Sequence, residues 1–345
     1  MLLLVFLVFA VLAILAFMED RLTDLHKGVA FLVLITFMAM MVGLRPDDFD
    51  KDYSSYVSLY NNPYTYDIEV SFMFIAYLVR QLSDDVVLMF LIYAFLALII
   101  HSFAVKRLTE LWFLSLLMYA GTYFLLHGMN QIRVGVAAAI FLMALPHLKS
   151  GERKKYFLYA VCATLFHYSA CILFFFSFFG FQPMKRWQYF FYLGVIPFAY
   201  MLYLAHVNIL VTIPIPYFEE KLKIYQTLQE QEGKWTDINV FNLVLLTKIV
   251  IIYFLLWKSK LIHEHNEYGT VLLKIEVLSI AAFVMLYELP VLAFRICELL
   301  GIVEIILFPM LYYTVKPSWV GKTLVTVVAT CLLLINIYYN GYVNV

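Results

Sequence analysis

The sequence predicts an all-α integral membrane protein that crosses the bilayer many times. Hydrophobic residues make up 64% of the chain and charged residues only 14%, whereas a soluble domain is about 45–50% apolar and about 25% charged. The mean hydropathy is +0.86, and the apolar residues occur in runs of membrane-spanning length. Lysine plus arginine equals aspartate plus glutamate at 24 each, so the overall charge gives no indication of a nucleic-acid partner.

Apolar runs divide the chain into predicted spans, since a spanning helix needs about 20 apolar residues. Two segments fit this pattern less simply: residues 68–82 are short and include Glu69, and residues 156–181 are long and interrupted at His167. We expect roughly 10–12 transmembrane helices in a single domain over residues 1–345. The runs of spanning length are 1–18, 29–44, 86–105, 111–127, 134–148, 189–213, 239–257, 270–288, 296–315 and 323–340.

The basic loops predict the orientation, because loops rich in lysine and arginine stay in the cytoplasm. We expect 156–181 to fold as a broken hairpin near His167 that enters from the cytoplasm, since the opposite threading places the basic segment 149–155 (KSGERKK) outside. Both termini then lie outside, and 43–85 and 214–238 become outer loops. The second loop carries aromatic residues and is either a lid over a site or a solvated connector.

The stretch 43–72 is the first polar cluster in an otherwise apolar sequence. Because its carboxylates are costly in hydrocarbon, we expect them to face water at the outer surface. A polar substrate can meet them there, so the stretch is predicted to form one wall of a catalytic or binding site. Its acidic residues are Asp47, Asp48, Asp50, Asp52, Asp67 and Glu69.

Four arginines fall on the outer side as solitary residues beside helix ends. Topogenic arginines should lie inside, and a guanidinium forms forked hydrogen bonds with phosphate or carboxylate. We therefore predict a ligand or a carboxylate partner for them; the alternative is a rim arginine that reaches the lipid headgroups. They are Arg45, Arg80, Arg133 and Arg295.

A second polar cluster joins two predicted spans at residues 125–134. Gly128 permits a tight turn there. Asn130 and Arg133 then lie in the first turn of the next helix, where free backbone N–H groups and the positive end of the helix dipole favour an anion. Ordinary N-capping by Asn130 is compatible with this prediction.

His167 is predicted to lie beyond the middle of the membrane. It follows the cytoplasmic Lys155 by twelve residues, or about 18 Å of helix at roughly 1.5 Å per residue. A histidine is costly there without a partner, and imidazole suits general-base catalysis near neutral pH. The alternative is a core histidine bonded to a backbone carbonyl.

These polar elements together resemble the EpsG family of bacterial membrane proteins, which is similar to Wzy-type polymerases of O-antigen and capsular polysaccharide. This sequence departs from the family pattern at Glu69-Val70-Ser71-Phe72, where the family usually has Glu-Pro-Gly-Phe, and at Val134, where it usually has glutamine. The matching residues are Arg45, Asp52, Tyr53, Tyr56, Glu69 with Phe72, Asn130 with Arg133, His167 with Ser169, and Arg295.

The resemblance implies a polymerase of the bacterial inner membrane, with a fold related to the C-type glycosyltransferases and a site that faces the periplasm. Such enzymes transfer a growing glycan from undecaprenyl pyrophosphate onto the non-reducing end of a lipid-linked repeat unit, in lipopolysaccharide, capsule or exopolysaccharide synthesis. The expected partners are this lipid-linked oligosaccharide as donor and acceptor, the lipid bilayer and a chain-length regulator protein, with no nucleic acid. No cofactor is expected.

The resemblance also implies roles for individual residues. His167 is the expected base, with Glu69 or Asp52 as alternatives. No metal is expected if arginines neutralise the pyrophosphate, although the acidic stretch 43–72 keeps a divalent-cation site open as the alternative. The expected sugar contacts are Asp52, Tyr53 and Tyr56. The expected pyrophosphate ligands are Arg133, Arg295, Arg45 and Asn130.

Two other classes of function stay open. An O-antigen ligase, or another glycosyltransferase that uses lipid-linked sugars, differs only in its acceptor, which the sequence does not name. A flippase or exporter of lipid-linked glycans is not an enzyme and needs polar residues along both leaflets, whereas the polar clusters here fall on the outer side. The polymerase is therefore the preferred interpretation.

Overall fold

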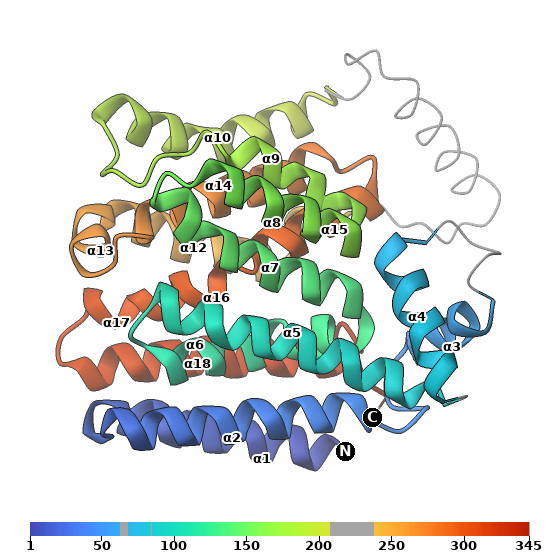
Figure 1. Ribbon diagram of the computed structural model, residues 1–345. Helices are drawn as coiled ribbons and strands as arrows, with labels where there is room; N and C mark the ends of the chain where they lie inside the picture. Colours follow the sequence, from blue (N-terminus) through green and yellow to red (C-terminus); the bar gives the residue numbers. More distant parts are fainter. Residues whose placement is uncertain (63–67, 84, 208–237, 345) are drawn as a thin grey trace. The chain divides into compact units, whose positions relative to one another are not determined.

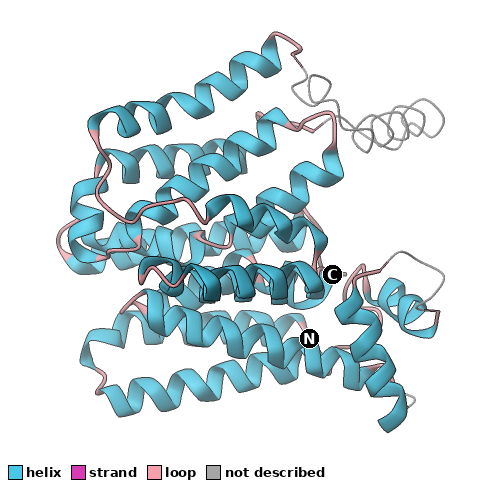
Figure 2. Ribbon diagram, turned by 45° about the horizontal axis from the view of Figure 1, so that its top comes forward, coloured by secondary structure: helices cyan, strands magenta, loops and turns pink. Residues whose placement is uncertain are grey.

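The protein is helical throughout the part of the chain that the computed structural model describes, residues 1–62, 68–83, 85–207 and 238–344. Figure 2 shows helices joined by loops, without strands, across these ranges. Extended pairing there is limited to one antiparallel bridge between Asp50 and Val343. The predicted all-α class is confirmed.

The chain divides into two compact units, which are described separately. Unit 1 consists of Met1–Gly180 and Glu304–Val345, and unit 2 of Phe181–Val303. The expectation of a single domain over residues 1–345 stays a prediction.

Unit 1 contains the long helices of the N-terminal half together with the C-terminal helices. Its elements are α1 (Leu2–Met18), η1 (Glu19–Arg21), α2 (Asp24–Gly43), α3 (Tyr53–Asn61), α4 (Val70–Leu82), α5 (Val87–Leu108), α6 (Trp112–Thr122), η2 (Leu126–Asn130), α7 (Ile132–Lys149), α8 (Arg153–Phe166), η3 (Tyr168–Ile172), α9 (Leu173–Phe176), α16 (Glu304–Leu307), η5 (Phe308–Met310), α17 (Leu311–Thr314) and α18 (Ser318–Tyr338).

The described part of unit 2 consists of helices and the loops that connect them. Its described elements are α10 (Arg186–Leu204), α12 (Leu243–Trp257), α13 (Ser259–His265), α14 (Gly269–Met285) and α15 (Pro290–Gly301).

Among the described residues, five helices are long and apolar enough to cross a membrane, which confirms an integral membrane protein. They are Leu2–Arg21, Asp24–Gly43, Val87–Leu108, Ile132–Lys149 and Ser318–Tyr338. Shorter apolar helices cover Val70–Leu82, Trp112–Thr122 and Leu243–Trp257. Other predicted spans correspond to shorter helices within the described ranges; the run 296–315, for example, is shared among α15, α16, η5 and α17.

The core of unit 1 is formed by α6 and α7, which are buried along most of their length. In contrast, α1 and α2 keep large apolar side chains on their outer faces: Leu3 is 78% exposed, Leu25 74% and Leu32 64%. In a membrane protein such faces meet lipid rather than water. The two N-terminal helices are therefore at the periphery of unit 1.

The predicted break at His167 is confirmed. Helix α8 ends at Phe166, and His167 has extended backbone angles (φ −155°, ψ 120°) before η3 begins. The chain then turns back on itself, because the Tyr156 hydroxyl donates to the carbonyl oxygen of Leu173 at 2.7 Å. The rings of Phe157 and Phe174 also stack with centroids 5.7 Å apart.

The segment before α7 forms the π-helical turn η2, in which Gly128 is helical rather than part of a tight turn. The expectation of a turn at Gly128 is therefore wrong. A second glycine permits the close packing here: a Cβ atom added at Gly135 would overlap the carbonyl oxygen of His127. A side chain at position 135 must therefore push η2 away from α7.

We expect Gly135→Ala to destabilise the protein by about 1–3 kcal/mol, the usual cost of overpacking a core. Gly28→Ala is the matched control, because a Cβ atom added at Gly28 has no neighbour within 4 Å. Alanine also favours a helix over glycine by roughly 0.5–1 kcal/mol. Thermal unfolding in detergent should show a lower midpoint for the first variant only; equal midpoints would contradict the close packing.

Candidate functional site

The polar stretch 43–72 and the residues that follow it form two short helices, α3 and α4, at one end of unit 1. Figure 1 shows them beside the C-terminus of the chain. The contact is direct: the backbone N–H of Asn344 donates to the carbonyl oxygen of Phe49 at 2.8 Å, and Lys51 Nζ donates to the carbonyl oxygen of Asn340 at 3.0 Å. The C-terminal segment, which the sequence analysis did not single out, thus supports the predicted site.

Glu69 and His167 form a buried pair. Glu69 is the residue before α4, and His167 is the residue after α8. One carboxylate oxygen of Glu69, Oε1, lies 2.8 Å from His167 Nδ1, and because an ionised carboxylate only accepts, the Nδ1–H group is the donor. Both residues are at most 5% exposed. Because α8 ends at Phe166, the imidazole of His167 lies within hydrogen-bond distance of the Glu69 carboxylate.

Arg133 pairs with the other oxygen of the same carboxylate. Its Nη1 group donates to Glu69 Oε2, and its guanidinium carbon lies 5.8 Å from the ring centroids of both Tyr56 and Phe72. Glu69 thus bridges a cation in the first turn of α7 and the imidazole at the end of α8. Three residues that the sequence predicted for the site are brought together.

Several polar atoms around this bridge are buried and have no hydrogen-bond partner among the described residues. They include His167 Nε2 and Arg133 Nε. Leaving such atoms unpaired costs free energy, so they are the natural points of contact for a ligand or water. The second nitrogen of His167 and the Nε atom of Arg133 are therefore predicted contact points for a ligand.

Tyr93 is a site residue that the sequence analysis missed. Its ring packs against Phe72 at 6.1 Å and against Phe166 at 6.2 Å, so it lies between the start of α4 and the end of α8. The only signal in the sequence was a hydroxyl group inside an apolar span, which is too common to indicate a site.

All three guanidinium nitrogens of Arg45 donate hydrogen bonds to groups inside the protein. Its Nε donates to Asp50 at 2.5 Å, its Nη1 to the carbonyl oxygen of Val42 at 2.9 Å and its Nη2 to that of Met129 at 3.2 Å. The guanidinium also lies 4.2 Å from the ring centroid of Phe90. The carboxylate partner of Arg45 is therefore Asp50. Glu69 pairs with Arg133 and His167 instead.

Asn130 holds the backbone rather than capping a helix. Its side-chain amide donates to the carbonyl oxygens of Leu125 at 3.0 Å and Tyr342 at 2.9 Å. It ends η2, and Gln131 precedes the first residue of α7 without a side-chain capping bond. N-capping by Asn130 is therefore wrong; the residue connects the π-helical turn to the C-terminal segment.

The three predicted sugar contacts differ in exposure. Tyr56 is 5% exposed and its ring packs on Phe72 at 6.1 Å, whereas Asp52 and Tyr53 are half-buried. Burial and the nearby charge of Asp50 raise the pKa of Asp52. Asp52 and Tyr53 are thus the more accessible of the three.

Other predicted elements belong to unit 2 or lie outside the described residues. Arg295 lies in α15 of unit 2 and is exposed. Asp67 and nearly all of the loop 214–238 lie outside the described ranges. Within those ranges, no three histidine, cysteine, aspartate or glutamate side chains gather in an arrangement suited to a metal ion.

The charge of Glu69 is stabilised by its two partners. Burial raises its pKa, but the hydrogen bond from His167 and the charge of Arg133 outweigh burial, so the pKa lies below the ordinary 4.5. A carboxylate with a lowered pKa adds stability above its unfolded-state pKa, and this stability is lost as the pH falls through the folded-state value.

We therefore expect wild type to be more stable than Glu69→Gln at neutral pH, with a difference that narrows below about pH 4.5. The comparison is made by thermal unfolding of both proteins in detergent at stepwise lower pH. A difference that stays constant from pH 7 to pH 3 would show that the Glu69 charge adds no stability.

Comparison with known proteins adds one match. The model of the EpsG family matches residues 28–344, nearly the whole chain. No curated protein and no solved structure matches the chain.

Proposed function

The chain belongs to the EpsG family, and from this premise we propose that it polymerises a bacterial surface polysaccharide. Membership supports a role in surface polysaccharide biosynthesis. The finer proposal is that the protein transfers a growing glycan from undecaprenyl pyrophosphate to the non-reducing end of a lipid-linked repeat unit. The reaction takes place at the periplasmic side of the bacterial inner membrane.

One observation carries this proposal: Glu69 joins His167 to Arg133. A carboxylate that accepts from one imidazole nitrogen orients the ring and leaves the other nitrogen as a base. His167 Nε2 is that nitrogen, since it is buried without a partner among the described residues. In this proposal Glu69 is a positioning residue and His167 is the base, in preference to Glu69 or Asp52.

The proposed reaction is a direct displacement. His167 Nε2 takes the proton of the acceptor sugar hydroxyl, and the hydroxyl oxygen bonds to the anomeric carbon of the donor glycan. The bond from that carbon to the pyrophosphate oxygen breaks, and its electron pair leaves with undecaprenyl pyrophosphate. Arg133 stabilises the departing charge, because a preorganised cation in a dry site strongly favours a developing anion.

The other residues support the two substrates. Asp52 and Tyr53 contact the sugar. The Tyr56 ring packs beside the Arg133 guanidinium and the Phe72 ring, and forms the aromatic side of the sugar site. Arg45 and Asn130 act indirectly, by holding the outer stretch and the C-terminal segment through their bonds to Asp50 and Tyr342.

The function is tested by deleting the gene and separating the surface glycan on a gel. Loss of a polymerase leaves a single repeat unit on the lipid anchor, and this is the expected result. Loss of a ligase removes glycan from the final anchor altogether, and loss of a flippase traps repeat units inside; either pattern would replace the proposal.

We also expect polymerisation by the purified protein to be unchanged in EDTA, because arginines neutralise the leaving pyrophosphate. Complete loss of activity that Mg²⁺ or Mn²⁺ restores would instead assign this role to a divalent cation.

A further inference from the structure

Unit 2 contains a pocket that the proposed reaction does not use. The pocket has a volume of about 710 Å³. Its lining comes from the residues just before α10 and the first turns of α10, and from residues 257–261, which run from the end of α12 into α13. This volume is within the range of small-molecule sites, about 300–1,000 Å³. Its cationic lining residues are Arg186, Lys258 and Lys260, and its lining includes no acidic residue.

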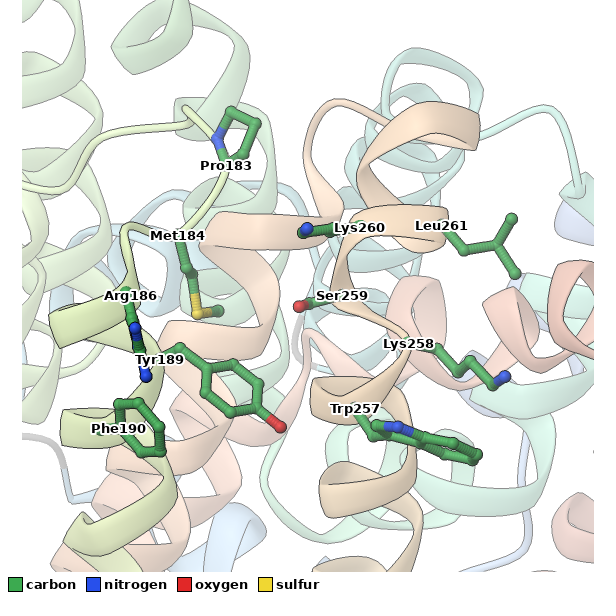
Figure 3. A pocket seen from close by; sticks show the side chains of 10 residues that line it. All are labelled: Pro183, Met184, Arg186, Tyr189, Phe190, Trp257, Lys258, Ser259, Lys260 and Leu261. Carbon is green, nitrogen blue, oxygen red and sulfur yellow. The ribbon is translucent and has the colours of Figure 1, made fainter.

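Polar groups from both segments point toward the space between them. Figure 3 shows the Lys260 ammonium and the Ser259 hydroxyl on one side and the Tyr189 hydroxyl on the other. Arg186 lies beside Tyr189, whereas Lys258 points away and is held over the ring of its neighbour Trp257, 4.1 Å from the centroid. The pocket therefore presents hydrogen-bond donors and positive charge together.

Among the described residues, no carboxylate neutralises the positive charges of the pocket. Within the described ranges, no carboxylate forms an ion pair with Arg186, Lys258 or Lys260. Like charges that converge without a counter-ion repel one another, and an anion removes that cost. Phosphate oxygens suit the site, because they accept from guanidinium, ammonium and hydroxyl groups at once.

The pocket also lies where an apolar helix ends. Helix α12 closes with the buried Leu255 and Leu256, after which Trp257 is 66% exposed and the basic segment Lys258-Ser259-Lys260 follows. On the α10 side, Trp187 is likewise 66% exposed. Tryptophan beside lysine at the end of an apolar helix is typical of the lipid headgroup region.

We propose that this pocket binds a phosphate group at the membrane surface, with the headgroup of an anionic phospholipid as its ligand. Arg186 and Lys260 hold the phosphate oxygens, and Ser259 and Tyr189 donate hydrogen bonds. The exposed indole of Trp257, which also lines the pocket, lies against the glycerol and the upper acyl chains. The pocket shares no lining residue with the Glu69 bridge, so substitutions in the pocket leave the proposed catalytic groups unchanged.

The test is the binding of short-chain phosphatidylglycerol to the purified full-length protein in a neutral detergent, with phosphatidylcholine and inorganic phosphate measured in parallel. Wild type should bind phosphatidylglycerol and not phosphatidylcholine. Arg186→Gln/Lys260→Gln should bind about 30-fold more weakly, since each basic residue near an anionic lipid contributes about fivefold. Both residues are exposed, so the variant is expected to fold.

The matched control is Arg153→Gln/Lys154→Gln, which removes the same charge from exposed residues of α8. It should change the affinity less than twofold. Inorganic phosphate binding as tightly as phosphatidylglycerol would support the phosphate site but assign it to a free phosphate compound. Equal loss in both variants, or no preference for phosphatidylglycerol over phosphatidylcholine, would overturn the proposal.

Discussion

His167→Ala is expected to reduce polymerisation by about 10²–10⁴-fold, the usual contribution of a general base. The acceptor hydroxyl then has no buried nitrogen to receive its proton, while Arg133 and the sugar contacts stay in place. The measurement is the rate of chain extension by purified protein on lipid-linked repeat units. In cells, a complemented deletion strain should carry mostly single repeat units.

Two further variants distinguish a base from a structural histidine. His265→Ala changes an exposed histidine of unit 2 and should leave the rate unchanged. Glu69→Gln should cost less than His167→Ala, and the double variant should be no slower than His167→Ala alone, because residues that act as one unit are not additive. A larger loss for Glu69→Gln, or full activity of well-expressed His167→Ala, would move the base to a carboxylate.

Arg133→Lys is expected to reduce polymerisation by about 100-fold, at the lower end of the cost of removing one preorganised donor. Arg133 uses Nη1 on Glu69 and keeps Nε free of protein partners among the described residues. A lysine has the same charge but a single nitrogen, so it cannot bridge Glu69 and a pyrophosphate in the same forked geometry. Chain-extension rate and the lengths of the chains formed are the measured quantities.

Arg80→Lys is the control for the same change in chemistry. Arg80 lies in the last turn of α4, and its guanidinium carbon is 4.8 Å from the ring centroid of Tyr60, a contact that an ammonium can also make. Its rate should stay within about threefold of wild type. Normal chain lengths in Arg133→Lys, or equal losses in the two variants, would remove Arg133 from the pyrophosphate site.

Much of the fold could be predicted from the sequence because hydrocarbon imposes strict demands on composition. Apolar runs of spanning length indicated the membrane class, and the interruption of one run at His167 indicated the end of α8. The division of the run 296–315 into short helices could not be predicted. Each piece is mainly apolar, so the hydropathy does not mark where one helix ends and the next begins.

The candidate residues could also be predicted, but their partners could not. Glu69, Arg133 and His167 stand out because each is polar beside apolar sequence. The bonds that Glu69 makes join residues 64 and 98 positions apart, and the sequence left open whether Glu69 instead holds Arg45. Tyr93 and the C-terminal segment were missed, since neither carries a charge in an unusual place.

The sequence by itself determined that this protein is a helical membrane protein of the EpsG family. It also indicated which polar residues require a partner or a ligand, because they lie beside apolar sequence. Only the tertiary structure decided that Arg45 pairs with Asp50 and that Glu69 joins Arg133 to His167. The physical reason is that burying a charge in a membrane protein is costly enough to be visible in composition. Which opposite charge compensates it depends on which helix ends meet, and that is decided by the packing of α4, α7 and α8.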